Sequence, residues 1–332
     1  MNKVIKKIIS AACVATMSIG MLAGCGSTKS SSGSIDGSGT RIMLIGTDRD
    51  DAYRKLLMDG IADQAKKAGV TLDDEECGND VEKQAEAARK AASGGYDAII
   101  CRIADASTAP QIELAAGDLP IIYVNNQPDE TALKADKYMY VASDEEECGR
   151  LQAEYVIKKV NKKEMNIVIM LGEKGHSATI ARTRANKNTL KKEGINYHVL
   201  FSDYANWNDE QARHDLDLFF KTGQSVDAIF CNNDTMALGA VQALKDNGLD
   251  PSKIPVTGCD ATPDGCKSIA SGGMQYTVFQ NAAGQARKAI EIAVALGKGG
   301  TAKGISGVTD NLLYGWVPFE PVDASNVKDY MS

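Results

Sequence analysis

The chain has 332 residues, of which 43% are hydrophobic and 24% are charged. This composition is typical of a folded globular protein and excludes wholesale disorder, and the length predicts about two domains. The formal net charge of −7 argues against the basic stripe of a general nucleic-acid binder, so no nucleic-acid partner is expected. With only three histidines, the chain has few candidate ligands for a His-built metal centre.

The first residues predict export. Three lysines precede residue 8, and an uncharged run of apolar and small residues follows from Ile8 to Gly24. The run is too short to span a membrane comfortably and is typical of a secretory signal peptide. It ends in LAGC, residues 22–25, which resembles the bacterial lipobox. We expect residues 1–24 to be removed and Cys25 to be linked to diacylglycerol; the alternative is a chance cysteine in a signal sequence.

Residues 25–39 predict a lipidated cysteine followed by a tether. Residues 26–39 read GSTKSSSGSIDGSG, a Gly/Ser-rich composition that behaves as a flexible coil with a reach of about 20 Å. No later segment approaches 18 consecutive uncharged apolar residues. The folded part is therefore expected on the extracytoplasmic face of the cell membrane, with the lipid on Cys25 as its only membrane contact.

Six cysteines remain in the expected mature chain: Cys77, Cys101, Cys148, Cys231, Cys259 and Cys266. An exported protein can form disulfides, but three of the six fall within or at the ends of apolar, strand-like runs, where a free cysteine acts as a small hydrophobe. The sequence contains no CxxC pair, so a zinc cluster is not expected. Their pairing stays open.

From Arg41 onward, short apolar runs alternate with longer amphipathic segments. The spacing of apolar residues predicts helices over Asp51–Ala68 and Val81–Ala92. Continuous apolar strands alternating with helices indicate parallel sheets covered on both faces. The predicted strands are Ile42–Gly46, Ala98–Ile103, Pro120–Val124, Ile167–Leu171, His198–Phe201, Ala228–Cys231, Val256–Cys259 and Gln275–Phe279.

The pattern repeats within the chain. Residues 97–101 read DAIIC and residues 227–231 read DAIFC, and each segment follows a predicted helix and precedes a polar loop. We interpret this as two similar doubly wound α/β units in tandem. Because such sheets bind ligands at the carboxyl ends of their strands, two facing units would share one cleft.

The loops after the predicted strands carry the residues that a sugar requires. Carboxylates, amides, an imidazole and a guanidinium can hold adjacent sugar hydroxyls, which both donate and accept hydrogen bonds. Two aromatic residues, Tyr53 and Trp207, come from different halves and could sandwich the apolar faces of a pyranose ring. The sequence therefore predicts a monosaccharide site between the two units.

Each of these residues also has a simpler interpretation. Asp51 and Asn233 could only cap helices, since Asp and Asn favour that position. Trp207 could be a surface anchor or a core residue, His176 a solvated loop residue, and Arg182 one member of a surface salt bridge. What favours the site is that nearly all of them fall at predicted strand ends.

From Arg41 to about Asn326 the chain resembles the bacterial type I periplasmic sugar-binding proteins, and most closely their galactose/glucose-binding members. The motifs that carry the resemblance are the Asp50-Asp51-x-aromatic loop, Asn125 before Pro128, GEKGH at 172–176 with Ala181-Arg182-Thr183, Trp207, NNDTMALGA at 232–240, and Asp260-Ala261. The resemblance implies sugar contacts from Asp51, Tyr53, Asn125, His176, Arg182, Trp207, Asn233, Asp260 and Gln280.

The resemblance also implies two lobes joined by a three-strand hinge, with crossings near Ala142–Ser143, Gln280–Asn281 and Gly315–Pro318. The N-terminal lobe would then comprise residues 40–142 and 281–315, and the C-terminal lobe residues 143–280 and 316–332. Bending at the hinge would trap the sugar and create the shape that a membrane permease reads.

The sequence departs from the family pattern in two respects. Ala178 replaces a family Asp, Asn126 and Gln127 replace a Lys-Glu pair, and Gln280 replaces an Asn, so the preferred sugar, epimer or anomer is not fixed. The stretch where the family carries a calcium loop is KKVNKKE, residues 158–164, which is short and basic. Because an oxygen-ligated cation needs acidic and carbonyl ligands, we expect no family-type calcium site and no other cofactor.

The sequence thus predicts a monomeric, lipid-anchored, hexose-binding subunit of an ABC sugar importer, which takes galactose, glucose or methyl galactoside and delivers it to permease subunits. Nothing marks Asp51 and Asp260 as glycosidase carboxylates, and no common catalytic motif is present, so we expect no enzyme activity. A sugar-responsive repressor would carry a helix-turn-helix where the signal and tether stand. The main alternative is a receptor module that presents its ligand to a chemoreceptor or other membrane sensor.

Overall fold

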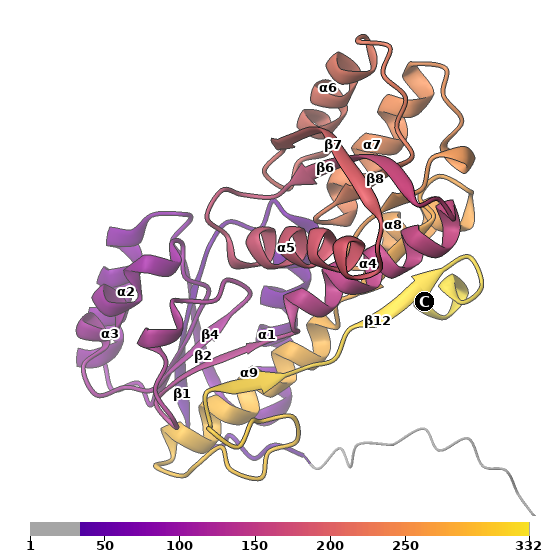
Figure 1. The fold of residues 1–332 in the computed structure, drawn as a ribbon. Helices are drawn as coiled ribbons and strands as arrows, with labels where there is room; N and C mark the ends of the chain where they lie inside the picture. Colours follow the sequence, from indigo (N-terminus) through magenta and orange to yellow (C-terminus); the bar gives the residue numbers. More distant parts are fainter. Residues whose placement is uncertain (1–33, 332) are drawn as a thin grey trace, which may run out of the picture. The chain divides into compact units, whose positions relative to one another are not determined.

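The computed structural model describes residues 34–331, so the predicted signal peptide, Cys25 and most of the tether lie outside the described residues. The chain from Ile35 onward forms one compact unit that contains two six-stranded sheets (Figure 1). The strands of the first sheet are β1 (Arg41–Gly46), β2 (Thr71–Glu76), β3 (Ala98–Cys101), β4 (Ile121–Val124), β5 (Tyr138–Ala142) and β11 (Tyr314–Trp316). Those of the second are β6 (Glu164–Leu171), β7 (Asn196–Tyr204), β8 (Ala228–Cys231), β9 (Val256–Thr257), β10 (Tyr276–Phe279) and β12 (Glu320–Asp323).

Helices cover both faces of each sheet, as expected for doubly wound units. Successive residues of β1 enter different cores: Ile42 and Leu44 pack with α1 and α9, whereas Met43 and Ile45 pack with α2 and α3. The second sheet is covered by α4 and α5 on one face and by α6, α7 and α8 on the other. The bounds are α1 (Ala52–Ala68), α2 (Val81–Ser93), α3 (Ala109–Ala116), α4 (Glu145–Val160), α5 (Ser177–Lys192), α6 (Asp209–Phe220), α7 (Asp234–Asp246), α8 (Pro263–Ala270) and α9 (Ala282–Gly297).

The two sheets have equivalent strand orders. Their strand orders are β11-β5-β4-β3-β1-β2 and β12-β10-β9-β8-β6-β7, so each of the first five strands has a counterpart in the second sheet. The repeated DAIIC and DAIFC segments have matching roles. The carboxylate of Asp97 accepts a 2.7 Å hydrogen bond from the Arg41 amide at the start of β1, and that of Asp227 accepts one of 2.7 Å from the Asn166 amide in β6. The predicted tandem of similar units is confirmed.

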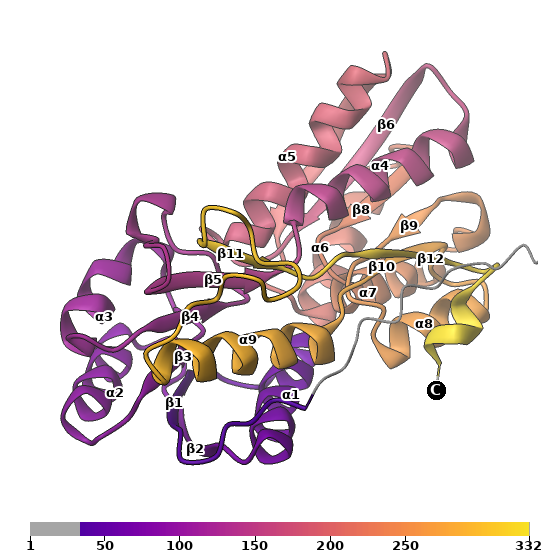
Figure 2. The ribbon, with the colours of Figure 1, turned by 90° about the horizontal axis from the view of Figure 1, so that it is seen from below.

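The chain passes between the two sheets three times. It does so between β5 and α4, between β10 and α9, and between β11 and β12, where Figure 2 shows the last segment running from one sheet to the other. Gly315 lies inside β11, so the third passage consists of residues 317–319. Strand β12 pairs antiparallel with β10, which makes the second sheet mixed at its edge. The lobe boundaries expected from the sequence stay predictions.

No helix within residues 34–331 is long and apolar enough to cross a membrane.

Candidate functional site

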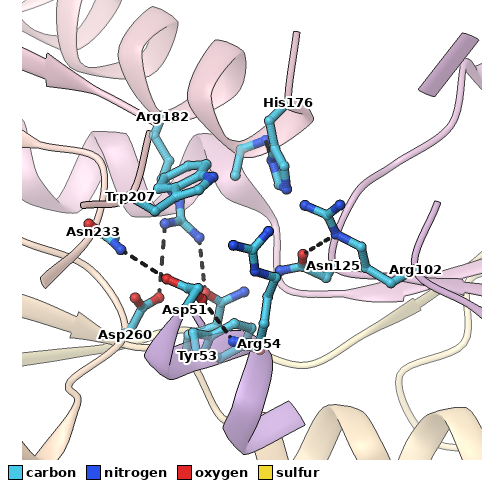
Figure 3. Close-up of a pocket in the computed structure, with 12 residues that line it drawn as sticks. Asp51, Tyr53, Arg54, Arg102, Asn125, His176, Arg182, Trp207, Asn233 and Asp260 are labelled. Atoms are coloured by element: carbon cyan, nitrogen blue, oxygen red, sulfur yellow. Dashed lines mark hydrogen bonds and ion pairs between the residues drawn. The ribbon is translucent and has the colours of Figure 1, made fainter. Parts of the chain in front are cut away.

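A cavity lies where the carboxyl ends of the strands of the two sheets meet (Figure 3). Its empty space, counted out to its open mouth, amounts to about 300 Å³. The structure brings all nine predicted site residues to this cavity, together with three that the sequence reasoning did not select. The lining residues are Asp51, Tyr53, Arg54, Arg102, Asn125, His176, Ala178, Arg182, Trp207, Asn233, Asp260 and Gln280.

Three of the predicted residues cap a helix and line the cavity at the same time. Asp51 Oδ1 accepts from the Arg54 amide at the start of α1, at 2.8 Å. Asn233 Oδ1 accepts from the Met236 amide at the start of α7, at 2.9 Å, and its Nδ2 lies 3.4 Å from Asp51 Oδ2 across the cavity. His176 Nδ1 accepts from the Ala178 amide at the start of α5. These capping hydrogen bonds hold the three side chains at fixed positions beside the cavity.

Three others are held by a backbone that is unusual for their residue types. Asn125, Trp207 and Asp260 have φ angles of 63°, 64° and 114°. A positive φ is costly for a residue with a Cβ, and such residues cluster at functional sites because the surrounding structure maintains the strain. Asp260 is also fixed by backbone hydrogen bonds in both directions, since its amide donates to Val278 O and its carbonyl accepts from the Gln280 amide.

Trp207 is buried rather than a surface anchor, with an exposed fraction of 9%. A Cβ added to Gly172 would lie 2.0 Å from the Trp207 ring, so the indole packs directly on this glycine. The rings of Trp207 and His176 are nearly perpendicular, with a centroid distance of 5.2 Å. Tyr53 approaches from the first turn of α1 on the opposite side of the cavity (Figure 3).

Arg182 anchors a buried polar network. Its Nε donates to Glu145 Oε2 at 2.6 Å, its Nη1 to Asn232 O at 2.6 Å, and its Nη2 to Gln280 Oε1 at 2.9 Å. The Asp260 carboxylate lies 4.0 Å from Nη1. Arg182 is 3% exposed and is therefore not a surface salt-bridge residue. It links the cavity to Glu145 and Gln280, which stand beside two of the passages between the sheets.

Arg54 and Arg102 form a second charged group with Glu173. Glu173 belongs to the β6–α5 loop of the second lobe, and it accepts from Arg54 Nη1 at 3.0 Å and from Arg102 Nη2 at 3.3 Å. Arg54 also pairs with Asp48 at 3.2 Å. Arg102 is fully buried and donates to Asn125 Oδ1 at 3.2 Å. These contacts join the two lobes at one side of the cavity.

Burial dominates the electrostatics of the site. It raises the pKa of Asp51, against the nearby Arg54 and Arg102, and raises the pKa of Asp260 well above its usual range. Burial also lowers the pKa of His176 well below its usual value, and the cations Arg102 and Arg182 lower it further. The imidazole is therefore neutral near pH 7, as its role as a hydrogen-bond acceptor at the start of α5 requires.

The sequence reasoning missed Arg54, Arg102 and the second-layer Glu145. Arg102 was placed inside a predicted strand that ran to Ile103, but β3 ends at Cys101, so Arg102 is the first residue after the strand. Arg54 directly follows the Asp50-Asp51-x-aromatic motif, which ends at Tyr53, on the first turn of α1. Glu145 is the first residue of α4 and directly follows the first passage between the sheets.

The described residues contain no cluster of His, Cys, Asp and Glu that could hold a metal ion. Between α4 and β6, where the family resemblance would put a calcium loop, lie only residues 161–163. The absence of a calcium site stays a prediction. All six cysteines of the described region are buried and free. Cys101 and Cys231 end their strands inside the hydrophobic cores, as expected for small apolar side chains.

The comparisons with known proteins agree with this architecture. Residues 42–301 match the family model described as "Periplasmic binding protein domain". The chain is 33% identical over 287 residues to the putative rhizopine-binding protein of Rhizobium meliloti, which covers 85% of this chain and 89% of that protein. It is 27% identical over 255 residues to the D-galactose/methyl-galactoside binding periplasmic protein MglB of Haemophilus influenzae, covering 72% and 76% of the two chains.

A solved structure shows the same fold. The ABC transporter solute binding protein of Bacillus halodurans, with bound myo-inositol, superposes with a TM-score of 0.77 at 28% identity, covering 89% of this chain and 98% of that chain. The family consists of extracytoplasmic solute-binding proteins, not enzymes. This chain belongs to the type I periplasmic sugar-binding family, the substrate-binding proteins of ABC sugar importers.

Proposed function

We propose that this protein is the lipid-anchored, monomeric substrate-binding subunit of an ABC importer for a neutral hexose, such as galactose, glucose or methyl galactoside. The observation that carries the proposal is the single cavity in which all nine predicted residues meet. Its side chains include hydrogen-bond donors and acceptors, and an aromatic residue from each lobe. Asp51, Tyr53, Asn125, His176, Arg182, Trp207, Asn233, Asp260 and Gln280 are the proposed sugar contacts.

The charge pattern favours a neutral ligand. Each arginine of the cavity has a carboxylate partner in the protein: Arg54 and Arg102 share Glu173, and Arg182 has Glu145. A ligand carboxylate or amine would have to compete with these buried pairs, whereas hydroxyl groups can add to the hydrogen bonds without changing the charge balance.

A cyclitol is the second candidate ligand, because the structurally similar Bacillus halodurans protein is described with bound myo-inositol. A hexopyranose and myo-inositol are both six-membered rings with hydroxyls around the rim. Ala178 lines the cavity where the family carries an Asp. In our proposal, the loss of this hydrogen-bond acceptor distinguishes a hexose ligand from a cyclitol.

Binding of the hexose or cyclitol is tested by titration calorimetry on the mature chain. The panel contains D-galactose, D-glucose, methyl β-D-galactoside, D-ribose, D-xylose and myo-inositol, with amino acids as controls. We expect saturable binding of one molecule of a hexose per chain. Binding of an amino acid, or of no polyol, would overturn the proposal. Methyl β-D-galactoside should be recovered intact, since no catalysis is proposed.

The proposed anchor and partner are tested in cells. Cys25→Ser should release the protein from the membrane fraction into the soluble fraction, whereas Cys77→Ser should leave it membrane-bound. Retention of the Cys25→Ser protein in the membrane would contradict lipidation at this residue. A pull-down that recovers permease subunits would support delivery to an importer, and one that recovers a chemoreceptor or sensor instead would support the alternative receptor role.

A further inference from the structure

The first turn of α1 carries two buried polar atoms without a hydrogen-bond partner in the described part of the chain. They are Oη of Tyr53 and Nε of Arg54. Tyr53 is 3% exposed and Arg54 is 7% exposed, and both residues line the cavity. Leaving a buried polar atom without a hydrogen bond costs free energy, so we look to a bound ligand for the missing partner.

These two atoms stand apart from the other buried polar atoms that lack a partner. The others belong to residues that do not line the cavity: Thr40, Arg49, Thr179, Asn186, Thr257 and Gln285. Only Tyr53 and Arg54, which are neighbours in sequence, place such atoms at one wall of the cavity. The two terminal nitrogens of Arg54 pair with Asp48 and Glu173, whereas its Nε makes no hydrogen bond in the described part of the chain.

The environment of the Tyr53 hydroxyl is polar although its ring is packed in an apolar core. The ring belongs to the cluster formed by α1, α9 and the first sheet, with Leu57 and Ala286 among its members. Burial raises the pKa of the Tyr53 hydroxyl well above its usual value, and Asp260 and Glu145 of the second lobe raise it further. The packed ring holds the hydroxyl at a fixed position in the lining of the cavity.

We propose that Tyr53 is a specificity-determining residue, whose hydroxyl forms a hydrogen bond with one hydroxyl group of the bound polyol, while Arg54 Nε donates to an oxygen on the same side of the ligand. This inference rests on the proposed function and extends it, because the sequence assigned to Tyr53 only the stacking of its ring. Tyrosine can donate and accept, and Arg Nε can only donate, so the pair selects an oxygen over a hydrogen atom or a methyl group. A ligand that lacks this oxygen leaves both buried atoms unpaired and is strongly disfavoured.

The test combines one variant with a set of deoxy ligands. The probe is the polyol of the calorimetry panel that binds the wild-type protein most tightly, together with each of its monodeoxy analogues. Tyr53→Phe keeps the ring and removes only the hydroxyl. We expect Tyr53→Phe to bind the parent polyol at least fivefold more weakly than the wild type does. One monodeoxy analogue should bind the wild type at least tenfold more weakly than the parent, and it should bind both proteins equally.

Tyr123→Phe is the matched control, because Tyr123 is also buried but its hydroxyl contacts Glu113 outside the cavity. It should bind the parent polyol as the wild type does. Equal affinity of Tyr53→Phe and the wild type for the parent would overturn the inference. So would a Tyr53→Phe defect of the same size for the parent and for every analogue, since that points to a structural role. If no polyol binds the wild type, the proposed function fails, and the inference fails with it.

Discussion

A residue at a strand end can serve the fold and the ligand at once. Asp51 shows how: one carboxylate oxygen accepts the amide hydrogen bond that starts α1, and the other faces Asn233 across the cavity. Asn233 divides its amide in the same way, with its oxygen capping α7 and its nitrogen reaching Asp51. Capping and binding, which the sequence presented as alternatives, are therefore compatible, and the cap orients the atom that faces the ligand.

The first residue-scale prediction concerns Trp207 and Asp260. Trp207→Ala removes one apolar wall of the cavity, and Asp260→Ala removes a buried acceptor beside Arg182. Each substitution should weaken sugar binding at least tenfold, which corresponds to about 1.4 kcal/mol. Calorimetry against the best hexose of the panel measures the loss.

The other tryptophan supplies the control for this prediction. Trp316 lies in β11 and does not line the cavity, so Trp316→Ala should leave hexose affinity within twofold of the wild type. If Trp207→Ala and Asp260→Ala both bind the hexose as well as the wild type, the cavity is not the binding site.

The second residue-scale prediction concerns pH. Burial lowers the pKa of His176 in the folded protein below its value of about 6.5 in the unfolded chain. As the pH falls below about 6.5, the unfolded chain therefore binds up to one proton more than the folded protein. The stability that this group supplies is present above pH 6.5 and is lost as the pH falls, with a slope of up to about 1.4 kcal/mol per pH unit.

Denaturant unfolding between pH 5 and pH 8 measures this slope. His176→Asn is the matched variant, because asparagine is a good N-cap residue but does not titrate. The free energy of unfolding of His176→Asn should fall less steeply below pH 6.5 than that of the wild type. The difference between the two slopes should correspond to the uptake of about one proton on unfolding. Identical slopes would show that His176 is protonated equally well in the folded and unfolded states.

At the scale of elements, eight of the twelve strands in the described part of the chain coincide with predicted ones. β2, β5, β11 and β12 were not predicted, although β5 is buried at every position. β2 reads TLDDEE, with no apolar run, because it forms the edge of the first sheet and is partly exposed. β11 and β12 have only three and four residues and are defined by their pairing with distant strands. The predicted strand ends differ from the observed ones by up to three residues, and the two-residue difference at the end of β3 hid Arg102 inside a predicted strand.

The contact between α4 and α5 gives a prediction at this scale. A Cβ on Gly149 of α4 would lie 2.2 Å from the carbonyl oxygen of Arg182 in α5 and 2.8 Å from Ala185 Cβ. Gly→Ala in a helix normally stabilises it by up to about 1 kcal/mol, but here the clash with backbone outweighs that gain. Gly149→Ala should lower the melting temperature and also weaken hexose binding, because the two helices must separate and carry Arg182 with them.

Thermal unfolding and calorimetry check this prediction together. Gly78→Ala serves as a control for substitution of a glycine away from any neighbour, since nothing lies within 4 Å of its added Cβ, although its positive φ gives a small loss of stability. It should leave hexose affinity unchanged. A Gly149→Ala protein that is as stable as the wild type and binds as tightly would show that α4 and α5 can move apart freely.

At the scale of the whole molecule, the two lobes contact each other through polar side chains, unlike the apolar side chains that form the core of each lobe. Besides Asp51 and Asn233, the Ser177 hydroxyl accepts from the Gln127 amide at 2.9 Å, and the Ser177 amide donates to Asn126 Oδ1 at 3.2 Å. The sequence could predict the lobes from their repeated pattern. It could not predict these contacts, because each joins residues 50 or more positions apart and none repeats in the chain.

Two ion pairs of Glu173 join the lobes, one with Arg54 at 3.0 Å and one with Arg102 at 3.3 Å. Both guanidinium groups are buried, so removing their shared carboxylate leaves them poorly compensated. Glu173→Gln keeps the size of the side chain and removes its charge. We expect this change to favour separation of the lobes and to accelerate release of a bound hexose about tenfold, equivalent to about 1.4 kcal/mol.

Stopped-flow measurement of Trp207 fluorescence gives the release rate, and X-ray scattering of the free protein gives its radius of gyration. Lys174→Gln changes the charge of the exposed neighbouring residue and should leave both quantities unchanged. The Glu173→Gln protein should release hexose faster and show a larger radius of gyration without ligand. A release rate equal to that of the wild type would mean that hinge bending is governed by the ligand contacts alone, because the charged bridge would then contribute nothing to holding the lobes together.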